Sequence, residues 1–104
     1  MVIIVTERLK IVIACGLGTG TALFLKMVVE SICRKHNIKA DVETADATLA
    51  AALKADIIVT GPDLAEKFIQ EKAAKEVVSI YNYGDRKEIE EKLLEAIKRL
   101  TGGA

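Results

Sequence analysis

Hydrophobic residues along the chain fall into short, nearly continuous runs separated by stretches with helical spacing. Two runs, 9–14 ("LKIVIA") and 55–60 ("ADIIVT"), are rich in β-branched residues, which is typical of strands buried on both faces. A third run, 76–81 ("EVVSIY"), predicts another strand. Residues 38–44 ("IKADVET") alternate between apolar and polar side chains instead, which predicts a strand at or near the edge of a sheet.

The stretches after these strands carry the spacing of amphipathic helices. The first helix is predicted over 21–36, with Asn37 as its stop, and an Ala-rich second one over 47–54. A third opens at Pro62, because proline is favoured at the first helical position. The fourth covers 85–100. The apolar stripes of the first and last helices consist of Leu25, Val28, Val29 and Ile32, and of Ile89, Leu93, Leu94, Ile97 and Leu100.

Strand and helix thus alternate four times with short connections. This pattern predicts a small doubly wound α/β sandwich of flavodoxin-like or Rossmann-like type, with a four-stranded parallel sheet of order 2-1-3-4 and helices on both faces. We expect residues 1–104 to form a single domain, in which residues 1–8 either extend the first strand or precede it as an N-terminal extension. Such sheets bind ligands at the carboxyl ends of the strands where strand order reverses, here between the first and third strands.

Composition excludes several classes of partner. Fifteen basic and fifteen acidic residues cancel, so no net field attracts nucleic acid or an anionic membrane. The opening "MVIIV" is too short for a secretory signal or a membrane span. We therefore expect a cytoplasmic protein that is a monomer on its own.

The segment "CGLGTGT", residues 15–21, occupies the predicted reversal point. Its glycines allow backbone amides to turn inward at a helix N-terminus, which favours binding of a phosphate. Cys15 lies at its base, where the same amides lower a thiol pKa from about 8.5 into a range of about 3.5–7.5. A cysteine that only packs in the core does not need three alternate glycines and two threonines beside it. We therefore predict that Cys15 is a nucleophile. The expected phosphate cradle consists of Gly16, Leu17, Gly18, Thr19, Gly20 and Thr21.

The remaining cysteine and the histidine have simpler predicted roles. Cys33 lies about 27 Å from Cys15 along the first predicted helix, too far for a disulfide. With one histidine and no CxxC pair, the ligands of a structural metal site are lacking, and we expect neither a metal nor a cofactor. Cys33 is expected to pack in the core, and His36 to lie on the surface at a helix end rather than act as a catalytic base.

Other loop chemistries fit the residues poorly. A dinucleotide-binding G-x-G-x-x-G motif would need glycine where Thr21 or Leu23 stands, and a P-loop needs a Gly-Lys pair that the chain lacks. A cysteine-dependent phosphatase needs an arginine where Thr21 stands, to hold the transferring group. These features favour a phosphoryl carrier. A non-catalytic anion-binding or regulatory module of the same fold stays open as an alternative, with a phosphatase third.

The residues around the loop resemble a known family, the enzyme IIB (EIIB) component of the bacterial sugar phosphotransferase system (PTS), in its ascorbate-type branch, which is related to the galactitol branch. The resemblance covers the chain from Leu9 onward. Ala22 departs from the family pattern, in which serine is common, so one hydroxyl donor is lost while the backbone cradle is kept. The pattern is near A-C-G-x-G-x-G-[ST]-S-x-x-x-K-M-x-V-[DE], and it is matched by Ala14, Cys15, Gly16, Gly18, Gly20, Thr21, Lys26, Met27, Val29 and Glu30.

This resemblance implies a phosphotransferase. Cys15 would accept a phosphoryl group from the phosphohistidine of an EIIA component and pass it to an ascorbate-like sugar or a polyol held by the membrane EIIC component, at the inner face of the membrane. Two partners must then dock around one cysteine, which requires exposed apolar residues nearby. Leu17, Leu23 and Phe24 are candidates, although helical position favours the core for the last two. The candidates for the rim of the site are Thr60, Gly61 and Asp63, of which Asp63 also suits the opening of a helix.

Overall fold

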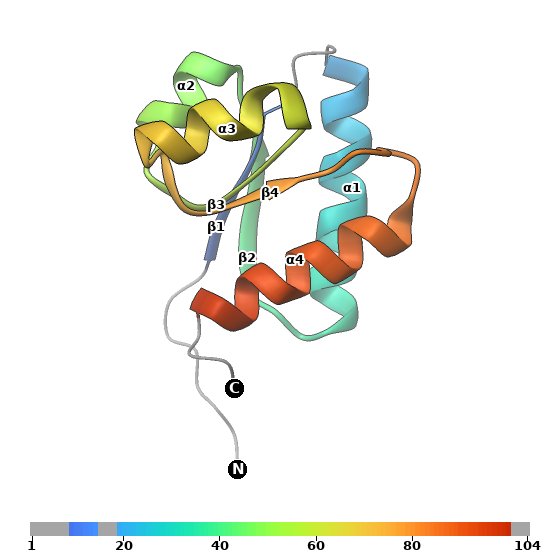
Figure 1. Cartoon of the computed structure of the whole chain (residues 1–104). Helices are drawn as coiled ribbons and strands as arrows, with labels where there is room; N and C mark the ends of the chain where they lie inside the picture. The colour runs from blue at the N-terminus through green and yellow to red at the C-terminus, as the bar shows by residue number, and fades with distance from the viewer. Residues whose placement is uncertain (1–8, 15–18, 101–104) are drawn as a thin grey trace.

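The computed structural model describes residues 9–14 and 19–100, which form four strands and four helices in strict alternation (Figure 1). The sheet is parallel throughout and has the order β2-β1-β3-β4. This confirms the predicted fold class and strand order. The elements are β1 (Leu9–Ala14), α1 (Thr19–Lys35), β2 (Ala40–Thr44), α2 (Ala47–Ala52), β3 (Ala55–Thr60), α3 (Pro62–Glu71), β4 (Ala74–Ser79) and α4 (Arg86–Leu100).

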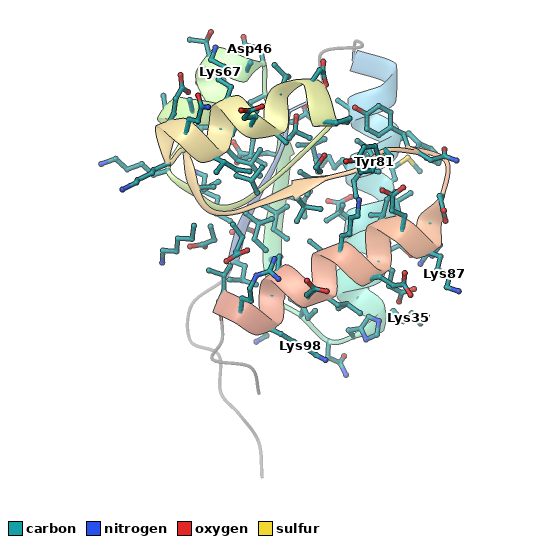
Figure 2. The ribbon with its side chains drawn as sticks, viewed as in Figure 1. Lys35, Asp46, Lys67, Tyr81, Lys87 and Lys98 are labelled. Carbon is teal, nitrogen blue, oxygen red and sulfur yellow. The ribbon has the colours of Figure 1, made fainter. Side chains whose placement is uncertain are left out.

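Helices cover both faces of the sheet, α1 and α4 on one side and α2 and α3 on the other (Figure 1). Successive side chains of a strand point to opposite faces, so Ile11 and Ile13 of β1 pack under α1 and α4, whereas Val12 and Ala14 pack under α2 and α3. The predicted apolar stripes of α1 and α4 lie in the first of these two cores. Charged side chains such as Lys67, Lys87 and Lys98 point outward (Figure 2).

The strand of alternating character lies at the edge of the sheet, as predicted. β2 pairs only with β1 among the described strands, and it buries Val42 while Asp41 and Glu43 are exposed. Only one face of this edge strand packs against the core, so the residues that point to its other face can be polar.

The boundaries of several elements differ from the predictions: β2 begins at Ala40 rather than at residue 38, and α2 ends at Ala52 rather than at residue 54. β4 runs from Ala74 to Ser79 rather than over 76–81. It ends before Tyr81 because the amide of Tyr81 donates to the Glu88 carboxylate at 2.9 Å instead of to a neighbouring strand. α1 begins at Thr19, two residues earlier than predicted. It ends at Lys35, one residue earlier than predicted, and Asn37, the expected stop, has a positive φ of 57° in the turn that follows.

Candidate functional site

Four connections meet at one edge of the sheet, where the parallel strands have their carboxyl ends. The chain runs from β1 to β2 on one side of β1 and then crosses to β3 on the other, so strand order reverses between β1 and β3. The first turns of α1 and α3 both lie at this edge (Figure 1). The reversal point predicted from the sequence is therefore present.

The predicted nucleophile belongs to the connection between β1 and α1. Residues 15–18, that is Cys15, Gly16, Leu17 and Gly18, lie outside the described residues. The residue before them, Ala14, is buried at the end of β1 and is the register partner of Thr60 of β3. The backbone of residues 19–21 forms the first turn of α1, so these three predicted cradle residues are helical.

The amino end of α1 has the electrostatic character of an anion site. This helix of 17 residues has no acidic residue in its first turn, whereas Arg34 and Lys35 lie in its last turn. The peptide dipoles place a partial positive charge at the amino end, and no carboxylate of the first turn offsets it. The residues that precede this turn are those of the cysteine loop.

The predicted rim residues follow β3 directly. Thr60 is fully buried, and its hydroxyl has no hydrogen-bond partner among the described residues; the same holds for the hydroxyl of Ser79, its register partner on β4. Gly61 caps α3, and its carbonyl accepts the amides of Leu64 and Ala65 at 3.2 and 3.0 Å. Two buried hydroxyls therefore lie side by side at this edge with unused hydrogen-bonding capacity.

Asp63 lies in the first turn of α3 and is exposed. Pro62 opens the helix as predicted, and a carboxylate in the first turn is favoured by the helix dipole. The structure thus brings Thr60, Gly61 and Asp63 to the edge where β1 ends. Asp63 also lies in the opening turn of α3, which is the alternative role that the sequence analysis gave it.

The sequence analysis missed Tyr83, which reaches this edge from the connection between β4 and α4. A Cβ atom on Gly61 would collide with the Tyr83 hydroxyl and would lie 2.9 Å from Oδ1 of Asp63. The phenol oxygen therefore lies directly against the Cα atom of Gly61. The available signal was the "YNY" sequence after the fourth strand, because the loops that follow neighbouring parallel strands share one edge.

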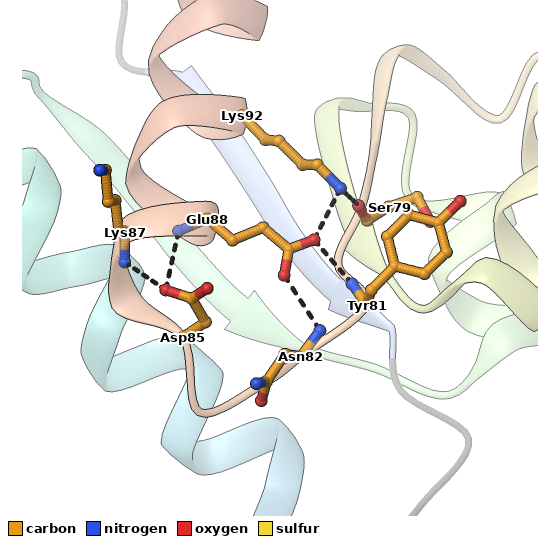
Figure 3. Close-up of polar contacts among 7 residues, drawn as sticks. All are labelled: Ser79, Tyr81, Asn82, Asp85, Lys87, Glu88 and Lys92. Atoms are coloured by element: carbon orange, nitrogen blue, oxygen red, sulfur yellow. Dashed lines mark hydrogen bonds and ion pairs between the residues drawn. The ribbon is translucent and has the colours of Figure 1, made fainter.

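A carboxylate fixes the loop that carries Tyr83 (Figure 3). Glu88 accepts the amides of Tyr81 and Asn82 at 2.9 and 3.0 Å and pairs with the Lys92 ammonium at 2.7 Å. Lys92 also donates to the Ser79 carbonyl at 2.7 Å and lies 4.6 Å from the centroid of the Tyr81 ring. The Lys92 hydrogen bond, followed by that of the Tyr81 amide, lowers the pKa of Glu88.

Exposed apolar side chains gather on the first half of α1. Leu23, Phe24 and Met27 are 53%, 48% and 66% exposed. The assignment of Leu23 and Phe24 to the core was therefore wrong, because the buried stripe of α1 uses Ala22, Leu25, Val28, Val29 and Ile32. Leu17, the third predicted docking residue, lies outside the described residues.

The predicted positions of Cys33 in the core and of His36 on the surface at a helix end are confirmed. Cys33 is buried in the core between α1 and the sheet, and burial together with the charge of Glu30 raises its pKa. His36 lies beyond the end of α1, with Nε2 2.8 Å from the Glu90 carboxylate of α4. Neither residue lies at the carboxyl edge of the sheet.

Together the described residues define a small doubly wound α/β protein in which the amino ends of α1 and α3 lie at the edge where strand order reverses. The family model described as "PTS system, Lactose/Cellobiose specific IIB subunit" matches residues 10–95. The chain belongs to this PTS IIB family, and it is a phosphotransferase, the phosphoryl-transfer component of a sugar PTS.

One similar protein agrees with this assignment, and a solved structure agrees with the fold. The "Ascorbate-specific PTS system EIIB component" of Mycoplasma pneumoniae is 33% identical over 89 residues, which cover 84% of this chain and 93% of that protein. The lactose-specific IIB domain of the phosphoenolpyruvate:carbohydrate PTS from Streptococcus pneumoniae superimposes with a TM-score of 0.60 over 93% of this chain and 98% of that one. At 11% identity this second likeness concerns the fold alone. Within the described ranges, no helix has the length and apolar character needed to cross a bilayer.

Proposed function

We propose that Cys15 is the phosphoryl carrier of this EIIB component, with Gly16–Thr21 as its phosphate cradle. The observation that supports it best is the place of the loop. It joins the buried end of β1 to the amino end of α1 at the point where strand order reverses. Backbone amides and the dipole at the amino end of a helix stabilise both an ionised thiol and a bound phosphoryl group.

The reaction consists of two in-line displacements. The Cys15 thiolate attacks the phosphorus of a phosphohistidine on an EIIA component; the S–P bond forms and the N–P bond breaks, with the electron pair leaving on the imidazole nitrogen. A hydroxyl oxygen of the sugar held by the EIIC component then attacks the same phosphorus. The S–P bond breaks, the thiolate is regenerated, and the hydroxyl proton is lost. The chain contributes positioning and amide stabilisation of charge on the phosphoryl oxygens.

The acceptor is an ascorbate-like sugar or a polyol, and the chain works in the cytoplasm at the inner face of the membrane through EIIC. The similarity to the ascorbate-specific EIIB component of Mycoplasma pneumoniae supports the ascorbate branch. Both partners must approach the same cysteine, and the exposed Leu23, Phe24 and Met27 provide an apolar surface directly after the loop.

The deciding experiment is the intact mass of the protein after incubation with phosphoenolpyruvate, the general PTS proteins and a candidate EIIA component. We expect the gain of one phosphoryl group, its loss in Cys15→Ser, and its retention in the matched variant Cys33→Ala. Phosphorylation of a folded Cys15→Ser protein would refute the assignment of the site. A thiol pKa near 8.5 for Cys15, with no mass gain, would favour the anion-binding module instead.

A further inference from the structure

The turns that follow α2 and α3 are built in the same way. Lys54 lies between α2 and β3, Lys72 lies between α3 and β4, and each has a left-handed backbone with φ of 53°. A buried alanine comes next in both turns, Ala55 in the first and Ala73 in the second. Ala55 and Ala74 are register partners on neighbouring strands, so the two turns lie side by side at the amino edge of the sheet (Figure 1). This edge is opposite the one where β1 and β3 end.

The two turns line an open cavity of about 470 Å³. Its floor consists of four alanines, all buried or half-buried, whose small side chains leave the space. Its rim consists of exposed charged residues, which are Lys54, Lys72, Lys75 and Glu71. Sites for small organic molecules have volumes of about 300–1,000 Å³, so the cavity has the size of such a site.

The rim carries more positive than negative charge. The ammonium of Lys75 lies 3.4 Å from the Asp56 carboxylate, which offsets it in part. In the described part of the chain, the ammonium groups of Lys54 and Lys72 have no hydrogen bond or ion pair. Two cations on neighbouring turns therefore flank one cavity and have unused capacity to bind an anion.

A purely structural role explains these two lysines poorly. Cations near the carboxyl end of a helix do offset its dipole, but Lys10 already serves the end of α2, where its ammonium donates to the Leu53 carbonyl at 3.1 Å. Glycine is the residue that adopts a left-handed backbone without a steric cost from Cβ. The chain thus has lysine twice where glycine would stabilise the fold more. Residues held in such conformations are concentrated at functional sites.

We propose that this cavity binds a small organic polyanion, a molecule that carries two or more phosphate or carboxylate groups. Lys54 and Lys72 would bind its anionic groups, and the alanine floor would contact its carbon skeleton. Lysine acts as a point charge, so the rim recognises negative charge and not the geometry of one kind of anionic group. The site lies away from the carboxyl edge of the sheet, and the proposal does not depend on the proposed carrier function.

The test follows the backbone amides of the full chain by NMR during titration with sodium pyrophosphate. A second arm uses sodium citrate, and sodium chloride keeps the ionic strength constant in both. We expect saturable shifts with one apparent Kd at the amides of residues 54–55 and 72–75, which an anion bound elsewhere on the chain would not move. The arm with the lower Kd identifies the ligand as a phosphate or as a carboxylate compound.

A pair of glutamines removes the two charges and keeps the length of the side chains. We expect Lys54→Gln combined with Lys72→Gln to raise the Kd about tenfold, because both cations face the bound anion. The matched control is Lys87→Gln combined with Lys98→Gln, which removes the same charge from the outer surface of α4 (Figure 2) and should bind like the wild type. An unchanged Kd in the Lys54 and Lys72 pair would overturn the proposal.

A pair of glycines separates binding from folding. Lys54→Gly combined with Lys72→Gly should bind as weakly as the glutamine pair, yet unfold at a higher urea concentration than the wild type, because glycine relieves the left-handed backbone. A glycine pair that unfolds at a lower urea concentration and still binds pyrophosphate would show that the lysines serve the fold, and would overturn the proposal. Shifts in the wild type that sodium chloride alone reproduces would overturn it as well.

Discussion

Ala14 and Thr60 are register partners at the carboxyl ends of β1 and β3. Through this pair the residue before the predicted nucleophile adjoins a fully buried threonine whose hydroxyl has no partner among the described residues. A buried hydroxyl without a hydrogen bond costs about 1–3 kcal/mol of stability. Because Thr60 lies beside the proposed reaction site, we expect its hydroxyl to serve that site rather than the fold.

Replacing Thr60 with valine separates these two roles. We expect Thr60→Val to raise the free energy of unfolding by about 1 kcal/mol, because it removes a buried hydroxyl that has no partner among the described residues while the shape is kept. The same variant should bind inorganic phosphate more weakly. Urea unfolding and the protection of Cys15 by phosphate against iodoacetamide measure the two effects, with Thr48→Val, exposed on α2, as the control that should change stability by less than about 0.5 kcal/mol. A loss of stability in Thr60→Val would mean that the hydroxyl has a stabilising partner after all.

The Glu88 carboxylate gives the loop of Tyr83 a pH dependence. Its pKa is lowered in the folded protein by Lys92 and by the amides of Tyr81 and Asn82. A lowered carboxyl pKa adds stability that is fully present above the unfolded value, about 4.3, and is lost as the pH falls through the folded value. Glu88→Gln should therefore unfold at lower urea concentration than the wild type at pH 7, and the difference should shrink toward pH 3.

The control for this experiment is Glu91→Gln, an exposed position on the same helix. It should follow the wild type at both pH values. A difference between Glu88→Gln and the wild type that stays constant from pH 7 to pH 3 would show that the charge of Glu88 is not what holds the loop.

The two cysteines should differ strongly in reactivity. Burial and the charge of Glu30 raise the pKa of Cys33, and its side chain is only 4% exposed. We expect iodoacetamide at pH 7 to label the native protein once, at Cys15, and to label Cys33 only after denaturation. Peptide mapping of the labelled protein checks this. Labelling of Cys33 at a similar rate in the native protein would contradict the buried position of its thiol.

Local sequence patterns predicted the helices and strands, but they could not predict contacts between separate segments of the chain. The bounds of β1 and β3 agree with the runs of β-branched residues, because strands buried on both faces leave a continuous apolar signal. The end of β4 was misplaced because the Tyr81 amide turns to Glu88, a contact that no local pattern reveals. Tyr83 was missed for the same reason, since only the folded sheet brings it to Gly61.

Leu23 and Phe24 show that the sequence alone does not reveal which apolar face of a helix is buried. Both have the hydrophobicity of core residues, yet α1 needs only one stripe to cover the sheet, and the rest of its apolar surface remains exposed. Which of two apolar faces is buried depends on how the helix lies on the sheet. A docking surface and a second core stripe therefore look alike in the sequence.

The exposed surface of α1 leads to the last prediction. Met27 is 66% exposed and, with Phe24, lines an open groove whose charged lining residues are Arg34, Arg86 and Glu30. Arg86 is held in place by a 2.9 Å hydrogen bond to the Ser31 hydroxyl. An EIIA component that docks here should offer an apolar contact with acidic groups around it.

Met27→Lys places a charge in this groove without touching the core. We expect it to lower kcat/KM for phosphoryl transfer from EIIA about tenfold, mainly through KM, because a central apolar contact contributes to binding rather than to the chemical step. The matched control is Ile69→Lys, which is 59% exposed on α3. It should leave transfer unchanged, and both variants should unfold at the urea concentration of the wild type. Equal loss of transfer in the two variants would mean that added charge, and not the α1 surface, is responsible.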